Sequence, residues 1–226
     1  MCGDTVIFVE ETDFRRQLIS MCESSSGNIL FFVDDMIFTH KLDYKVLENI
    51  DTSAYVVALS RGSDLTYSLI LKKEVTVPIF YEKIGGFNSF KWNEFAGYSD
   101  WTWNGTAECN DWSFPLGVSG YLFGRNESIA MLQCLEFHNP NTLEAQMQWF
   151  LPFFMNRRGL CPDAAISICV PANLVQTDYD NANIGTFSVE ELLDLWEKGK
   201  RIDVKEFYDK PLHVTQEHKY TFIDRD

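Results

Sequence analysis

Two adjacent acids interrupt an apolar segment near the N-terminus. Residues 28–38 read NILFFVDDMIF, so five apolar residues lead directly into Asp34 and Asp35, and apolar residues resume at once. A run of this kind predicts a strand buried on both faces, and in an open α/β sheet the carboxyl end of a strand is where ligands bind. Two carboxylates there suit a hard divalent cation that also holds phosphate oxygens. The alternative is a turn in which both acids only cap the next segment.

A second segment that could bind a ligand, residues 87–112, is rich in aromatic residues and holds four of the six tryptophans. Exposed indole rings stack on the apolar face of a sugar, so Trp103 and Trp112 are candidates to line a carbohydrate pocket. For most of these rings we expect the simpler role of packing a small subcore beneath a long loop or hairpin.

Composition limits the class of protein. The 226 residues are 46% hydrophobic, enough for one packed domain over residues 1–226. A net charge of −14 disfavours nucleic acid and anionic membranes as partners, although a bound metal ion still allows an anionic ligand. No apolar run is long enough to span a bilayer, and neither a secretion signal nor a CxxC pair is present. We therefore expect free thiols and a cytoplasmic location.

Hydrophobic periodicity then predicts the elements that position these residues. In the first part of the chain we expect segments at residues 5–9 (strand), 14–21 (helix), 28–38 (strand), 44–50 (helix) and 54–59 (strand). The first three would form a βαβ unit with parallel strands and a right-handed crossover. Arg61 follows the last strand, where it could pair with a phosphate or form a surface ion pair.

Later segments continue the pattern. We expect elements at residues 119–125 (strand), 127–135 (helix capped by Asn126), 142–150 (helix capped by Thr142), 165–171 (strand), 188–198 (helix opened by a capping box at Ser188 and stopped by Gly199) and 220–223 (edge strand).

Five short segments occur in an order that carries a resemblance. They are FVDDMIF at 32–38, DWSFPL at 111–116, SGYLF at 119–123, NPNTLE at 139–144 and VPANLVQ at 170–176. The set resembles nucleotide-sugar-dependent glycosyltransferases of the GT-A fold, in particular microbial and viral members with a Val-Asp-Asp strand and an Asn-Pro-Asn-Thr-Leu-Glu turn. The resemblance implies an α/β fold: a mixed, mostly parallel sheet with helices on both faces, an aromatic insertion at 87–112 and a C-terminal extension at 202–226.

The resemblance also implies a metal site. Mn²⁺ or Mg²⁺ would be held by Asp35 against the diphosphate of the donor, with Asp34 on the ribose or on a metal-bound water. A late histidine, for which His213 is the candidate, would complete the ligand shell. The cation would neutralise charge on the departing nucleotide diphosphate.

Other residues would bind the substrates or move a proton. Glu144 would take the proton of the acceptor hydroxyl, unless it only favours the positive end of its helix; Asp111 is the next candidate. Hydroxyl groups of donor or acceptor would meet Asn141, Asn173 and Gln176, although a turn role explains Asn173 equally well.

These expectations favour a metal-dependent, hexosyltransferase-like enzyme that moves a sugar from a nucleotide-diphosphate donor to an acceptor hydroxyl. The family places one or two further βα units before its acidic strand, so we expect a shortened N-terminus and a reduced donor site. The alternative is accordingly a non-catalytic carbohydrate-binding protein that lacks a complete donor site. A Mg²⁺-dependent phosphotransfer or hydrolase domain is disfavoured, because no glycine-rich phosphate loop is present.

Overall fold

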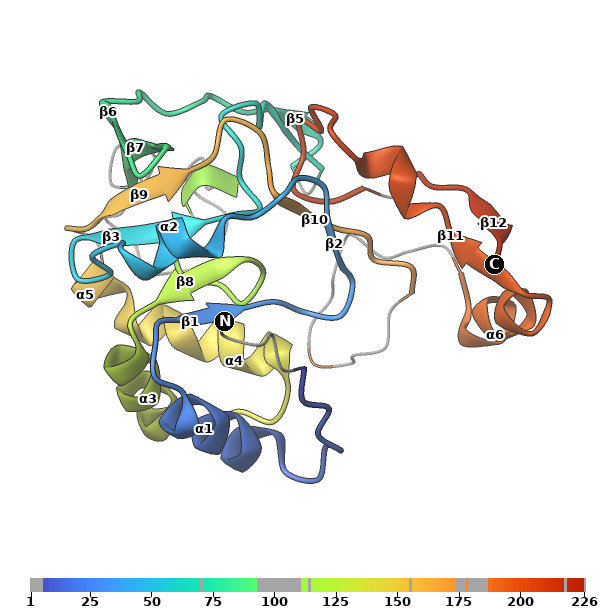
Figure 1. Cartoon of the computed structure of the whole chain (residues 1–226), viewed down its shortest axis with the longest axis horizontal. Coiled ribbons are helices and arrows are strands. Elements are labelled where there is room, and N and C mark those ends of the chain that lie inside the picture. The colour runs from blue at the N-terminus through green and yellow to red at the C-terminus, as the bar shows by residue number, and fades with distance from the viewer. Residues whose placement is uncertain are drawn as a thin grey trace.

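A six-stranded sheet crosses the centre of the protein (Figure 1). The computed structural model describes residues 6–69, 71–92, 111–113, 115–154, 156–173, 178, 187–217 and 219–225. In spatial order the strands are β1 (Ile29–Phe31), β8 (Tyr121–Phe123), β3 (Tyr55–Ala58), β9 (Arg158–Cys161), β7 (Phe87–Lys91) and β6 (Glu82–Ile84). Three two-stranded sheets accompany it: β2 (Met36–Phe38) with β10 (Ser167–Cys169), β4 (Tyr67–Ser68) with β5 (Lys73–Glu74), and β11 (Lys200–Ile202) with β12 (Phe222–Asp224).

The expectation of a mostly parallel, GT-A-like sheet is wrong. In the six-stranded sheet only β3 and β9 are parallel, and every other neighbouring pair is antiparallel. The predicted βαβ unit fails because residues 6–9 are exposed and have no regular structure. A direct hairpin joins the antiparallel strands β6 and β7, and its residues Gly85 and Gly86 adopt φ of 56° and 89°. Two glycines with positive φ suit a tight hairpin turn.

The segment at residues 28–38 is divided between two sheets. Strand β1 ends at Phe31, and β2 begins at Met36 and pairs with β10 instead. Asp34 and Asp35 therefore lie in the turn between the strands, and not at the end of one long buried strand. Apolar content alone does not show where a chain leaves one sheet for another, so the sequence predicted a single element.

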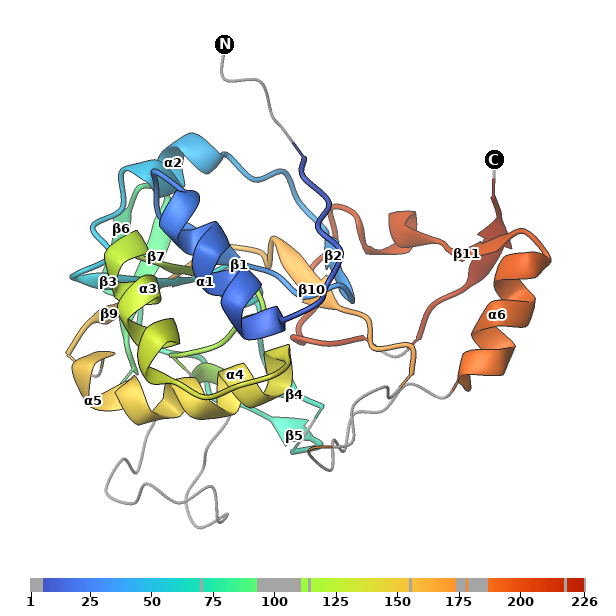
Figure 2. The ribbon, with the colours of Figure 1, turned by 90° about the horizontal axis from the view of Figure 1, so that it is seen from below.

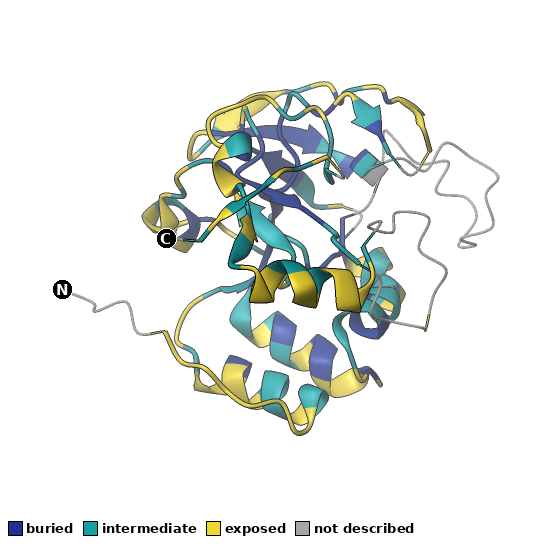
Figure 3. Ribbon diagram, turned by 90° about the vertical axis from the view of Figure 1, so that its right-hand side faces the viewer, coloured by how far each residue is buried: buried dark blue, intermediate teal, exposed yellow. Residues whose placement is uncertain are grey.

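Helices cover the sheet. One face packs against α1 (Phe14–Ser24), α3 (Arg125–Cys134), α4 (Pro140–Met147) and α5 (Leu151–Phe154), as Figure 2 shows. The second face packs against the short α2 (Tyr44–Glu48). Strand β3 and the residue after it contribute to both cores: Val56 and Ala58 join the first, while Val57 and Leu59 join the second. This alternation is the period of two expected of a strand, and Figure 3 shows the buried sheet between more exposed helices.

Capping residues explain where the helices begin. Asp13 caps α1, and the expected capping box at Ser188 opens α6 (Val189–Glu197). Two other caps were misplaced: α3 begins at Arg125, so Asn126 does not cap it, and Asn139 instead of Thr142 caps α4. Thr142 is the third helical residue and completes a capping box with Asn139.

The aromatic residues near the ends of segment 87–112 belong to the core. Phe90, Trp92 and Trp112 are almost fully buried, and the rings of Phe90 and Trp112 lie 5.3 Å apart, edge to face. The subcore expectation is confirmed for these residues, whereas Trp103 and its neighbours lie outside the described residues. Beyond the sheet, α6, β11, β12 and the short η4 helix (Val204–Phe207) form a unit to one side (Figures 1 and 2). No helix in the described part of the chain is both long and apolar enough to cross a membrane.

Gly159 gives a test of the sheet packing. It faces Phe90 across the β7–β9 pair, and a Cβ there would lie 2.2 Å from Phe90 Cζ. We expect Gly159→Ala to lower the free energy of unfolding by about 1–3 kcal/mol through overpacking, measured by urea denaturation. Gly27→Ala is the control, because its Cβ would meet nothing within 4 Å; equal losses in both variants would contradict the packing.

Candidate functional site

The candidate site lies at one edge of the sheet. Because β1 and β3 both run antiparallel to β8, and β9 runs parallel to β3, the carboxyl ends of β1, β3 and β9 share this edge. Gly120, just before β8, ties the edge together: its N–H donates to the Phe31 carbonyl and its carbonyl accepts from Leu59 N–H, both at 2.8 Å. The acidic turn after β1 and Arg61 after β3 are thereby brought to the same edge of the sheet, on strands separated by β8 alone, as the strand-end argument predicts.

Asp35 is partly buried beside β10. Its carbonyl accepts from Val170 N–H at 2.8 Å, and its carboxylate accepts a hydrogen bond from the Cys169 thiol. Burial, and secondarily the charge of Asp34, raise the pKa of Asp35, although the thiol bond opposes the shift. The Oδ1 atom is buried and has no hydrogen-bond partner among the described residues. Asp34 itself is exposed.

Asp111 reaches the same region from a short helical turn, η2 (Asp111–Ser113). Its Oδ1 atom accepts a hydrogen bond of 2.8 Å from Thr215 Oγ1, and its carbonyl accepts one from Arg61 Nε. The Oδ2 atom is buried and unpartnered within the described chain. Arg61 is only 7% exposed, with its guanidinium 5.0 Å from the centre of the Tyr121 ring. The surface ion pair considered for Arg61 is therefore wrong.

Glu144 approaches from the second turn of α4. Its Oε1 atom accepts a hydrogen bond of 3.2 Å from Val118 N–H. Burial raises the pKa of Glu144, and the nearby Arg61 charge partly offsets that rise. The approach requires Gly117, because a Cβ there would lie 2.8 Å from Oε1. The first turn of α4 holds no acid, so the helix-dipole role considered for Glu144 does not account for its position.

Cys169 connects the three acids. Burial raises the pKa of its thiol, and the charges of Asp35 and Glu144 act in the same direction. The backbone N–H of Cys169 donates to the Thr215 carbonyl at 3.2 Å, and Thr215 in turn holds Asp111. Asp35 and Glu144 thus lie near one thiol, Thr215 links Asp111 to the same strand, and Arg61 lies near Glu144 and the Asp111 carbonyl, although the acids come from three distant segments.

Sequence reasoning missed Cys169 and the segment at residues 215–217. Gln216 pairs with Cys169 in an isolated bridge, and its Oε1 atom is buried and unpartnered in the part of the chain that the structure describes. Paired residues direct their side chains to the same face, so Gln216 lies on the Cys169 side of β10. No local signal marks these residues, because only the tertiary pairing brings them to the acids.

The site offers oxygen donors to a divalent cation, but few of them. Among the described residues, no group of three or more His, Cys, Asp or Glu side chains is arranged to hold a metal ion. The unpartnered oxygens of Asp35, Asp111 and Gln216 are nevertheless the donor type that Mg²⁺ or Mn²⁺ prefers. Such a set fits a cation that takes few protein ligands and completes its shell with water and phosphate oxygens.

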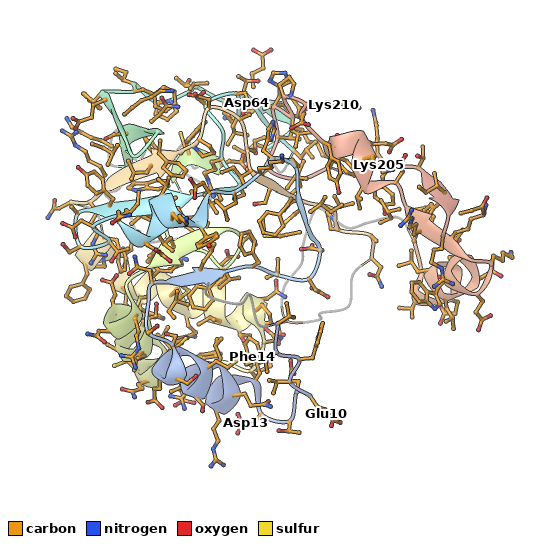
Figure 4. The ribbon with its side chains drawn as sticks, viewed as in Figure 1. Glu10, Asp13, Phe14, Asp64, Lys205 and Lys210 are labelled. Atoms are coloured by element: carbon orange, nitrogen blue, oxygen red, sulfur yellow. The ribbon has the colours of Figure 1, made fainter. Side chains whose placement is uncertain are left out.

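His213, the candidate late ligand, contacts a backbone carbonyl oxygen in this structure. It is exposed, adopts φ of 59°, and places Nδ1 3.0 Å from the Asp64 carbonyl oxygen. Its carbonyl accepts from the N–H groups of Thr66 and Tyr67 at 3.1 and 3.0 Å. Asp64 and Lys210, labelled in Figure 4, mark this junction between the C-terminal segment and the loop after β3. His213 therefore anchors that segment in this structure.

The expected substrate-binding residues are scattered. Trp112 is fully buried and donates from Nε1 to the Leu65 carbonyl at 3.2 Å, so its ring is not available for stacking on a sugar. Asn141 is the second residue of α4, and Asn173 lies in a bend after β10; both are partly buried. Trp103 and Gln176 lie outside the described residues.

Comparisons with protein-family models, with curated proteins and with solved structures find no match. The function is therefore argued from the chemistry of the site.

The buried charge of Asp35 predicts a pH-dependent stability. Because the pKa of Asp35 is raised in the folded state, the folded protein favours the protonated carboxyl. The free energy of unfolding therefore falls as the pH rises above 3.8, the ordinary pKa of an aspartate. We expect Asp35→Asn to melt at the wild-type temperature near pH 3.5. At pH 7 it should melt above wild type, by about 2–4 °C for each kcal/mol of destabilisation that the substitution removes.

Asp51→Asn is the matched control with the opposite sign. Hydrogen bonds from Ser53 lower the pKa of Asp51, so its charged form stabilises the fold and the variant should melt below wild type at pH 7. Calorimetric scans from pH 3.5 to 7 measure both. A destabilised Asp35→Asn variant at pH 7 would contradict the account.

Proposed function

We propose that this protein is a metal-dependent glycosyltransferase, which moves a sugar from a nucleotide-diphosphate donor to the hydroxyl of a carbohydrate acceptor. The observation that carries the proposal is a chain of contacts in which Asp35 and Glu144 lie near Cys169 and Arg61 lies near Glu144 and the Asp111 carbonyl, while buried oxygens of Asp35 and Asp111 have no partner in the described chain. The ordered sequence segments that resemble sugar transferases support it as well.

Asp35 is assigned to the cation. Its Oδ1 atom is desolvated and unpartnered among the described residues, which is costly unless a positive group meets it. The neutral oxygen of Gln216 would add a ligand, and the exposed Asp34 would contact the ribose or a metal-bound water. When bound, Mn²⁺ or Mg²⁺ supplies Lewis-acid stabilisation of the departing diphosphate. With few protein ligands, the site would bind cation and donor together.

Glu144 is assigned as the base that accepts the acceptor's proton. Its raised pKa brings the carboxyl closer to the working pH, which favours proton transfer. Arg61 opposes this rise, and it also fixes Asp111 through the carbonyl. We therefore assign the buried Arg61 to offsetting charge and positioning the acids. Asp111, already held by Thr215, is the second candidate for the base.

The alternative, a carbohydrate-binding protein without catalysis, depended on exposed aromatic rings. Trp92 and Trp112 are core residues, so they do not support it. We also propose the cytoplasm as the compartment, because Cys22, Cys134, Cys161 and Cys169 are free thiols.

Asp35→Ala tests the cation assignment. We expect wild-type protein to melt at a higher temperature with at least one of UDP-, GDP- or dTDP-sugars in the presence of Mn²⁺, since a ligand of the native state stabilises it. The variant should fold normally and lose this Mn²⁺-dependent shift. Asp51→Ala, at an exposed turn acid, should keep it. An unchanged nucleotide affinity in Asp35→Ala, measured by titration calorimetry, would refute the assignment.

Glu144→Gln separates chemistry from binding. The substitution is nearly isosteric, and its amide oxygen can still accept from Val118 N–H. We expect donor and metal binding to persist while sugar transfer falls by about two to four orders of magnitude, the usual contribution of general acid–base catalysis. Glu136→Gln, at an exposed glutamate, should transfer at the wild-type rate. Wild-type transfer by Glu144→Gln would instead make Asp111 the residue to test, and binding without transfer in the wild type would favour the non-catalytic alternative.

A further inference from the structure

Helix α6 exposes an apolar stripe far from the candidate site. Val189, Leu193 and Trp196 are 57%, 53% and 59% exposed. They stand at positions i, i+4 and i+7, so they form one continuous line along the helix. Leu192 and Leu195 are partly buried beside this line. The helix is therefore apolar over a wider arc than its own small sheet covers.

Acidic residues border the stripe. At 100° per residue, Glu190 and Glu197 fall on the flank next to Leu193. They are seven residues apart, or roughly 10 Å along the axis at 1.5 Å per residue. Neither forms an ion pair in the described part of the chain, whereas Asp194 pairs with Lys198 at 2.6 Å. Two carboxylates are thus left beside an exposed apolar surface.

The helix is held firmly on β11 and β12. The guanidinium of Arg225, which follows β12, lies 3.6 Å from the centre of the Trp196 ring and donates to the Trp196 carbonyl at 2.5 Å. Lys200 and Asp224 join the two strands by an ion pair of 2.6 Å. Figures 1 and 2 show this unit at the side of the molecule. A surface fixed in advance loses little entropy on binding.

We propose that the exposed face of α6 is a docking surface for a basic amphipathic segment of a partner protein. Apolar side chains at helical spacing would cover Val189, Leu193 and Trp196, and Lys or Arg side chains would meet Glu190 and Glu197. This is helix-in-groove recognition with complementary rim charge. The inference does not depend on the proposed sugar transfer.

Charge selects this occupant over two others. An anionic membrane surface attracts helices with a basic polar face and repels carboxylates, and the exposed acids of α6 are of the wrong sign. A second copy would bring the same acids against each other in a chain of net charge −14. A basic partner would be attracted by Glu190 and Glu197, the same residues that disfavour an anionic membrane and a second copy of the chain.

Two synthetic peptides test the proposal. They are a 14-residue Leu/Lys helix with leucines at i, i+4 and i+7, and its Leu/Glu counterpart, both labelled for fluorescence anisotropy. We expect the Leu/Lys peptide to bind with an affinity that falls with added salt, and the Leu/Glu peptide not to bind. Leu193→Ser should weaken binding about tenfold, as for a central apolar contact. The double variant Glu190→Gln/Glu197→Gln should weaken it less and reduce the salt dependence.

Controls separate this surface from general attraction to an acidic protein. Phe8→Ser and Glu10→Gln change exposed residues elsewhere and should leave affinity unchanged. Equal binding by Leu193→Ser and wild type would overturn the proposal. So would binding of both peptides alike, binding of phosphatidylcholine vesicles lost in Leu193→Ser, or a dimer seen by light scattering that Leu193→Ser dissociates. Circular dichroism confirms that each variant is folded.

Discussion

The site depends on placing the carboxylates of Asp35 and Glu144 where water is scarce, with the buried guanidinium of Arg61 near Glu144. Burial raises the pKa of Asp35 and Glu144, so the folded chain carries these groups at a free-energy cost. Two neighbouring groups reduce this cost: the charge of Arg61 partly offsets that of Glu144, and the Cys169 thiol donates a hydrogen bond to Asp35. Two buried carboxylate oxygens, one on Asp35 and one on Asp111, still lack partners among the described residues, and this unmet demand for positive charge is the feature that most strongly indicates a ligand.

Short-range sequence patterns predicted the features of the fold that depend only on residues close together in the chain. The caps at Asp13 and Ser188 and the buried strand near Val56 follow from short-range patterns, and all three are present. Strand direction was not predictable in this way, because an apolar strand has the same pattern whether its neighbour is parallel or antiparallel. The prediction of a mostly parallel sheet was therefore wrong, although the two consecutive glycines at 85–86 are a sequence signal for a tight hairpin turn.

Several residues of the candidate site were predicted from the sequence, but the contacts that join them were not. Asp35, Asp111, Glu144 and Arg61 were each selected from the sequence, and the structure brings them into one neighbourhood. What joins them was not predictable, since Cys169 and the Thr215 segment carry no motif. Trp112 shows the converse error, because an aromatic ring near the acids looked suited to sugar and in fact fills the core.

The bond between Thr215 and Asp111 has a consequence for how the protein assembles. It joins residues 104 positions apart, and the same segment also borders Cys169. Contacts between such distant residues form slowly, because a long loop must close before they contribute. On the ribosome, the sheet residues emerge well before Thr215. The acids would then remain in an incomplete, hydrated arrangement until residues 215–217 dock, so the candidate site is completed at a late step of folding.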